Sequence, residues 1–175
     1  MKGALFDRKP YDIMVGIWVG TAVSFSPTGK QVSQGLSRNI IYWHRRPTEN
    51  EPGLLHFRQD QGVPQTGAPV SLAGLIFAEY DLEVMGKHAE SRPHGRQTLT
   101  LLATETRPDV YHFDGEDGGF HWYNSHYFAS ADERHIMGPL VNKAGEVGLI
   151  HVQIFTRIDY DVPDNLRREL HNGHT

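Results

Sequence analysis

Stretches in which apolar and polar residues alternate recur along most of this chain, with short polar loops between them. Such alternation is typical of strands that bury one face of a sheet. We therefore expect strands over residues 17–25, 32–44, 54–60, 75–84, 97–105, 110–113, 120–128, 135–141 and 147–158. Helical patterns are confined to one or two short turns within residues 4–14, where Pro10 interrupts them, and to residues 163–171.

Residues that favour turns separate the expected strands. Pro27 and Gly29 lie within residues 26–30 as in a hairpin loop, and the glycines of residues 114–119 favour a tight turn. Residues 86–95 are expected to form another loop. Eight or nine strands with short connections predict an all-β fold, an antiparallel meander that closes into a barrel, with a sandwich as the alternative.

The size of the chain matches one such unit. Its 175 residues fit a single domain, and 38% hydrophobic with 22% charged residues is the balance of a chain that builds a core. Folding at this length buries roughly 70% of the surface that the unfolded chain exposes. We expect one lipocalin-like β-barrel domain over residues 1–175, with short helices near both ends.

Charge and composition exclude several kinds of partner and site. The net charge is −4 and the densest basic run is Arg45-Arg46, so no nucleic-acid-binding surface is predicted. No stretch has the roughly 20 apolar residues of a membrane-spanning helix, and the N-terminus lacks the apolar run of a signal peptide. The absence of cysteine removes disulfides and thiolate chemistry and suits a reducing compartment. These features predict a cytoplasmic protein without a membrane partner, and they leave open whether it forms a homo-oligomer.

Residues near the two ends of the chain carry a family resemblance. The first expected strand opens with Gly16-Ile17-Trp18, and the last one carries Arg157. This arrangement resembles the calycin superfamily of lipocalin-like barrels, in which a basic side chain packs over the tryptophan and seals one end. The resemblance implies that Arg157 contacts Trp18, and a cation–π contact of this kind contributes roughly 1–2 kcal/mol. It also implies a pocket inside the barrel, without choosing between carriers and enzymes.

Histidine is unusually frequent, with 11 among 175 residues, and histidines on strands are the first candidates for proton transfer. On the last expected strand, His151 and Gln153 share a face with Arg157. If Arg157 closes the barrel, His151 and Gln153 line its pocket, and His151 serves as an acid or base. The alternative assignment turns the isoleucine and valine face of this strand inward and leaves His151 in solvent.

The aromatic stretch over residues 120–128 offers a second candidate surface. Alternate positions place Trp122 and His126 on one face. This pattern predicts that Trp122 contacts a ligand and that His126 is a second acid or base. The alternative is that the large rings only pack in the core.

The second and third expected strands carry a polar cluster. Tyr42 lies on the second strand, and His56 and Arg58 share a face of the third. Adjacent strands would bring the three side chains together, so that Tyr42 and Arg58 orient the polar end of a ligand and His56 exchanges a proton with it. The alternative is a cross-strand cluster on a solvated outer face.

Motifs for several other chemistries are absent from the sequence. It has no His-x-His pair, no His-Glu-x-x-His, no Gly-x-Ser-x-Gly and no phosphate-binding glycine loop. We therefore expect no metal site and no cofactor, and no hydrolase, nucleotide-hydrolysing or dinucleotide-binding role. A mononuclear metal site and a haem held by one histidine remain as alternatives.

These patterns favour a small-molecule enzyme that works without a cofactor. It would hold an apolar or aromatic ligand in the barrel and act on it by histidine acid/base chemistry, as a lyase, dehydratase, isomerase or cyclase. The alternative is a non-catalytic carrier of a lipid, tetrapyrrole or pigment, whose cavity should be mostly apolar with one polar anchor. A domain that only mediates interactions is a third hypothesis.

Overall fold

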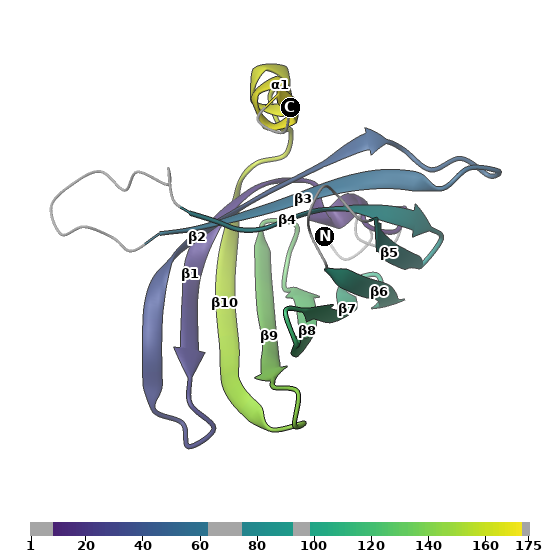
Figure 1. The fold of residues 1–175 in the computed structure, drawn as a ribbon. Helices are drawn as coiled ribbons and strands as arrows, with labels where there is room; N and C mark the ends of the chain where they lie inside the picture. The colour runs from purple at the N-terminus through teal and green to yellow at the C-terminus, as the bar shows by residue number, and fades with distance from the viewer. Residues whose placement is uncertain (1–8, 63–74, 93–98, 173–175) are drawn as a thin grey trace, which may run out of the picture.

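The strands of the computed structural model form one closed antiparallel barrel (Figure 1). The structure describes residues 9–62, 75–92 and 99–172. The 3₁₀ turn η2 (Asp12–Met14) precedes the first strand, and the helix α1 (Asp164–Asn172) follows the last. The strands are β1 (Gly16–Phe25), β2 (Gln31–Arg45), β3 (Gly53–Gly62), β4 (Leu75–Met85), β5 (His88–Arg92), β6 (Thr100–Arg107), β7 (Val110–Asp117), β8 (Phe120–Phe128), β9 (Glu133–Val141) and β10 (Val147–Asp159).

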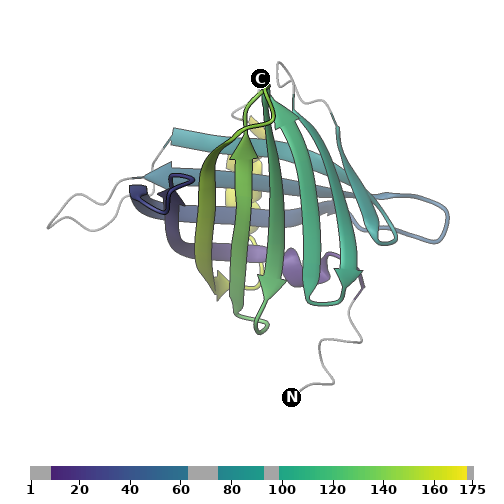
Figure 2. The same cartoon turned by 90° about the horizontal axis from the view of Figure 1, so that it is seen from below.

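Each strand pairs with its neighbour in the chain, and β1 pairs with β10 to close the barrel. Strands β1 and β10 lie side by side, whereas β7 to β9 run across β2 to β4 on the other side of the interior (Figure 2). A meander in which every strand has two partners leaves no unpaired edge among the described strands. This confirms the all-β barrel predicted by the alternating pattern, and the sandwich alternative is wrong.

The structure differs from the predicted elements mainly between β4 and β8. Strand β5 (His88–Arg92) replaces half of the loop predicted over residues 86–95, because Gly86 adopts a φ of 59° and allows a tight turn after β4. Strand β7 continues to Asp117, and the chain reverses at Gly118, which also has a positive φ. Parts of the predicted elements, residues 4–8 and 93–98, lie outside the described residues.

One end of the barrel is closed around Trp18, which is fully buried. Its indole Nε1 donates a hydrogen bond to the carbonyl oxygen of Met14 in η2, at 2.8 Å. The guanidinium carbon of Arg157 lies 4.2 Å from the centre of the Trp18 ring, which confirms the contact implied by the calycin resemblance. Trp18 and Arg157 together form the plug of the barrel. A Cβ at Gly16 would lie 2.3 Å from the carbonyl oxygen of Asp159, so only glycine fits beside this plug.

The chain leaves β10 and returns over the outside of the barrel as α1 (Figure 1). Val162 and Leu166 pack on Ile40 and Tyr42 of β2, and the guanidinium carbon of Arg167 lies 5.3 Å from the centre of the Tyr42 ring. The helix therefore covers one part of the outer face of β2. Among the described residues, no helix combines the length and apolar character needed to cross a membrane.

Candidate functional site

A cavity of about 320 Å³ lies inside the barrel, beyond the layer of side chains around Trp18. Its walls are mostly aromatic and aliphatic, from Phe57, Ala78, Tyr80, Leu99, Phe113, Phe120, Trp122, Ile136 and Leu140. Polar residues share the lining, namely Gln59, Glu79, Asn124, His126, His151 and Gln153. A concave, largely apolar space with a few polar groups is the usual form of a small-molecule site.

The inner face of β10 is the one that carries Arg157. His151 and Gln153 line the cavity on this face, as the alternation along the strand predicts. Ile154 and Ile158, on the other face, are 51% and 62% exposed. The alternative assignment, with the isoleucine and valine face inward, is therefore wrong.

His151 is held in place from the neighbouring strand. Its Nδ1 lies 2.8 Å from the hydroxyl oxygen of Ser24, the residue opposite it in the β1–β10 pair. Partial burial lowers the pKa of His151, because a desolvated imidazole disfavours its charged form. A hydrogen bond on one ring nitrogen fixes the orientation of the ring, and the other nitrogen, Nε2, has no hydrogen-bond partner among the described residues.

His126 lies deeper in the barrel, opposite Ile136 in the β8–β9 pair. It is fully enclosed and stacks on Phe113, with the ring centres 4.2 Å apart. Burial, and then the nearby positive charge of Arg134 and the ring of His112, hold the pKa of His126 well below its usual value. Both cavity histidines are therefore neutral at pH 7.

Two glutamines span the cavity wall. Gln59 Nε2 on β3 donates a hydrogen bond to the hydroxyl of Ser37 at 3.1 Å and another to Gln153 Oε1 at 3.3 Å. These bonds join β2, β3 and β10 at one level of the barrel. Trp122 lines the same space from β8, in the place that the alternating pattern predicts.

A buried guanidinium that the sequence pattern does not reveal lies at the level of the plug. Arg134 on β9 is fully buried, 4.8 Å from the Trp18 ring centre, and its Nη2 donates a hydrogen bond to Asn39 Oδ1. Its Nε and Nη1 have no hydrogen-bond partner among the described residues. Burial lowers the pKa of Arg134 to about 9, and the side chain adds positive potential to the space around Tyr80 and His126.

Tyr42, His56 and Arg58 do not lie in the cavity, so the prediction that they hold a ligand inside the barrel is wrong. On β3 the inward positions are occupied by Phe57 and Gln59, and the alternation of a strand turns His56 and Arg58 to the outer surface. Tyr42 also faces outward, where α1 packs against it. The three residues do lie on one face, and the Tyr42 and His56 ring centres are 4.8 Å apart.

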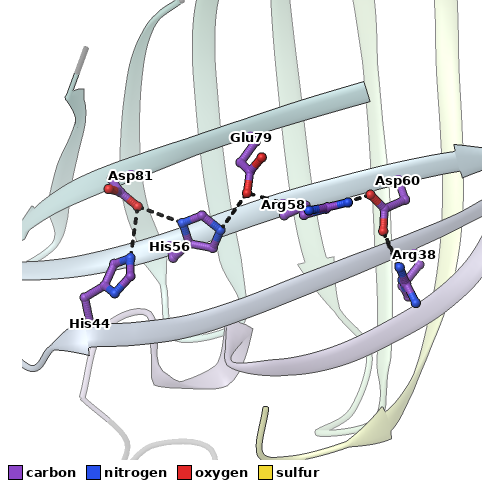
Figure 3. Close-up of polar contacts among 7 residues, drawn as sticks. All are labelled: Arg38, His44, His56, Arg58, Asp60, Glu79 and Asp81. Atoms are coloured by element: carbon purple, nitrogen blue, oxygen red, sulfur yellow. Dashed lines mark hydrogen bonds and ion pairs between the residues drawn. The ribbon is translucent and has the colours of Figure 1, made fainter. Parts of the chain in front are cut away.

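On the outer surface these residues belong to a row of charged groups across β2, β3 and β4 (Figure 3). His56 Nδ1 lies 2.8 Å from Asp81 Oδ1, and its Nε2 lies 3.2 Å from Glu79 Oε1. Further along the row, Asp60 accepts hydrogen bonds from Arg58 (2.8 Å) and Arg38 (2.6 Å).

The contacts in this row favour the charged forms of His56 and Asp81. Burial on its own lowers the pKa of His56, but the hydrogen bonds and charges of Asp81 and Glu79 together outweigh burial and raise it. Burial on its own raises the pKa of Asp81, and contacts with His44 and His56 outweigh it and hold the pKa well below its usual value.

The sequence matches no protein-family model and no curated protein. The fold is similar to the S-type phycobiliprotein lyase CPES from Guillardia theta, with a TM-score of 0.62 and 10% identity over 84% of this chain and 89% of that one. A protein of unknown function from the DUF3598 family, from Nostoc punctiforme PCC 73102, has a TM-score of 0.62 and 11% identity over 84% of this chain and 48% of its own. Rv2717c from M. tuberculosis has a TM-score of 0.55 and 14% identity over 83% and 92%. At such identities the likeness shows the fold alone, a lipocalin-like barrel.

Proposed function

We propose that this protein binds a small, mostly aromatic or apolar molecule in the barrel cavity, and that His151 exchanges a proton with it without a cofactor. The observation that carries this proposal is the pair of imidazoles, His151 and His126, that burial keeps neutral in a mostly apolar cavity. A neutral imidazole at pH 7 is ready to accept a proton from a bound molecule. The Trp18–Arg157 contact supports the further proposal that the chain is a calycin.

The contact with Ser24 decides which way the proton moves. When His151 Nδ1 carries the ring proton and donates it to the Ser24 hydroxyl oxygen, Nε2 has a free lone pair and acts as a base. When the Ser24 hydroxyl donates to Nδ1, Nε2 carries the proton and acts as an acid. A proton removed from one atom of the ligand and returned at another balances an isomerisation, and its removal with loss of a leaving group balances an elimination. Both reactions need only this one side chain as proton carrier.

The polar lining favours an enzyme over a carrier. A carrier needs an apolar cavity with one anchor, whereas this cavity contains two histidines, two hydrogen-bonded glutamines and Asn124. The likeness to a phycobiliprotein lyase agrees with lyase chemistry in such a barrel. A carrier of a pigment or lipid is the second candidate, which the apolar majority of the wall supports.

Plugging the cavity tests the binding part of the proposal. The probes are anilinonaphthalene sulfonate and its uncharged analogue phenylnaphthylamine, two small aromatic dyes that fluoresce in apolar surroundings. Leu140→Trp places a large ring in the cavity from β9, and Met137→Trp makes the same change on the outer face of that strand, where Met137 is 59% exposed. We expect Leu140→Trp to weaken dye binding at least tenfold and Met137→Trp to leave it unchanged. Equal affinities in both variants would contradict binding inside the barrel.

A further inference from the structure

We propose that the outer face of the barrel holds a second site, a divalent transition-metal site formed by His44, His56 and Asp81. The three residues come from β2, β3 and β4, and each offers one ligand atom to the same point (Figure 3). This site lies on the opposite face of the sheet from the cavity and does not depend on the proposed function. It revises the expectation of no metal site, which considered spacing along the chain only.

The distances between the ligand atoms suit a metal ion. All three atoms lie within 4.8 Å of one another, with Asp81 Oδ1 2.8 Å from His56 Nδ1 and 3.5 Å from His44 Nε2. Zinc lies at about 2.0–2.2 Å from nitrogen and oxygen ligands, which places such ligands roughly 3–3.5 Å apart around the ion.

The contacts behind His56 are those of a metal-bound histidine. With Nδ1 on the ion, the proton of His56 lies on Nε2, which is 3.2 Å from Glu79 Oε1. A carboxylate that accepts the second ring proton of a metal-bound histidine orients the ring and strengthens the ligand. Glu79 is itself buried, and Arg58 lies 4.0 Å from it on the side away from His56. The supporting carboxylate therefore lies at the right distance from His56 Nε2, and a small adjustment of angle completes the hydrogen bond when the ion binds.

Tyr42 orders the two imidazoles. Its ring centre lies 4.8 Å from that of His56 and 5.0 Å from that of His44, and α1 packs over Tyr42 from outside. Side chains that are fixed before binding lose less entropy when they coordinate an ion. The His44 side chain is 28% exposed, so water can reach the remaining coordination position from that direction.

The donor set identifies the class of ion. Two imidazoles and one carboxylate suit zinc, copper, nickel and iron, whereas magnesium and calcium prefer oxygen ligands alone. Three protein ligands with an open position resemble catalytic rather than structural zinc sites. We therefore assign the site to zinc or a similar divalent transition-metal ion.

Zinc titration of the tag-free, full-length protein tests this assignment. Binding is followed by competition with a chelating dye and by calorimetry, after metal has been removed with a chelator. We expect one tight zinc ion per chain in the wild type. Loss of a supporting residue typically lowers metal affinity by roughly 10–100-fold, and we expect Glu79→Gln to lower the zinc affinity by a factor in that range. His44→Ala, which removes a ligand, should lower the zinc affinity by more.

His121→Ala is the matched control. His121 Nε2 lies 2.5 Å from Asp114 Oδ1, so it is also a histidine beside a carboxylate, but no second histidine joins it to form a group of three ligands among the described residues. We expect His121→Ala to bind zinc as the wild type does. Circular dichroism and thermal unfolding without zinc check that His44→Ala keeps the fold, and Asp81→Asn provides a second ligand variant.

Visible absorption of the cobalt-substituted protein gives an independent measurement. Bound cobalt should show the intense bands of a four- or five-coordinate ion in the wild type, and these bands should be lost in His44→Ala. The proposal is overturned if the wild type binds no stoichiometric zinc. It is equally overturned if His44→Ala binds zinc as tightly as the wild type, or if His121→Ala loses as much affinity as His44→Ala.

Discussion

Ser24 and His151 face each other across the β1–β10 pair on the inner face of the barrel, with the hydroxyl oxygen 2.8 Å from Nδ1. This contact fixes the imidazole of His151, a residue of the cavity wall, and leaves its Nε2 without a hydrogen-bond partner among the described residues. It is the feature of the molecule on which the proposed proton transfer depends, because a base must be oriented before it can act on a bound ligand.

Nitrobenzisoxazole provides a test of His151 that needs no knowledge of the natural substrate. This small aromatic molecule opens when a base removes its C–H proton and the N–O bond breaks. We expect the wild type to accelerate the reaction and His151→Ala to lower kcat/KM by roughly 10²-fold or more, as for a lost general base. Ser24→Ala should cause a smaller loss, because the ring then loses its orientation but not its basic nitrogen.

The outer histidine His135 is the control for this assay. It lies on β9, beside Glu133 on the outer surface, and is therefore remote from a bound molecule in the barrel. His135→Ala should react as the wild type does. Equal rates in the wild type and His151→Ala would refute the catalytic proposal and favour the alternative, a non-catalytic carrier.

The contribution of His126 to stability should fall on mild acidification, while His56, whose pKa is raised, contributes in the opposite direction. Because burial lowers the pKa of His126, the unfolded chain takes up a proton below pH ~6.5 that the folded chain does not. The unfolded state then binds more protons at His126, so the contribution of His126 to the free energy of unfolding decreases as the pH falls below ~6.5, by up to about 1.4 kcal/mol per pH unit for one histidine. His151 adds to this in the same direction. Urea unfolding between pH 7.5 and 5.5 measures the slope. His126→Gln should reduce it, and an unchanged slope would show that His126 is protonated in the folded state.

Arg134 should give the cavity a preference for ligands with an acidic group. The guanidinium is buried and forms only part of the hydrogen bonds it can donate among the described residues. Arg134→Met should therefore weaken binding of anilinonaphthalene sulfonate by roughly tenfold, because the positive charge of the guanidinium close to the cavity is lost. Phenylnaphthylamine, which lacks the sulfonate, should be much less affected, and Arg134→Lys should retain the preference. Equal losses for both dyes would mean that Arg134 acts only through the packing of the plug.

Trp18, at the closed end of the barrel, should contribute strongly to the stability of the fold. It is fully buried, donates a hydrogen bond to Met14 and lies against the guanidinium of Arg157. Trp18→Ala should lower the free energy of unfolding by roughly 3–5 kcal/mol, as for other large core truncations. Trp18→Phe should lower the free energy of unfolding by less, because most of the ring volume remains. Urea unfolding measures both, and a loss below 1 kcal/mol in Trp18→Ala would contradict the role of the plug.

The fold follows from the sequence because the dominant signal is strand alternation interrupted by turn residues. The strand that the pattern misses, β5, is five residues long, and Ala89 is its only buried hydrophobic residue. So short and polar a segment has no visible alternation, and its pairing with β4 depends on the turn at Gly86.

The site is only partly readable from the sequence. His151 is placed correctly because Arg157, on the same strand, supplies a reference for the inward face. Strand β3 has no such reference, although the alternation of Leu55 and Phe57 with His56 indicates its outward direction. The group of His44, His56 and Asp81 has no motif, because the three residues are separated in sequence and meet only through the register of β2, β3 and β4.

Histidine ring resonances in a nuclear magnetic resonance titration test the central claim most directly. The probe is anilinonaphthalene sulfonate, and the ring signals of His151 and His126 report on the cavity, while those of His121 and His135 report on the outer surface. We predict that the two cavity signals shift along one binding curve, with the affinity found by fluorescence, and that the two outer signals do not move. Shifts confined to His121 and His135, with His151 and His126 unaffected, would contradict a ligand site inside the barrel.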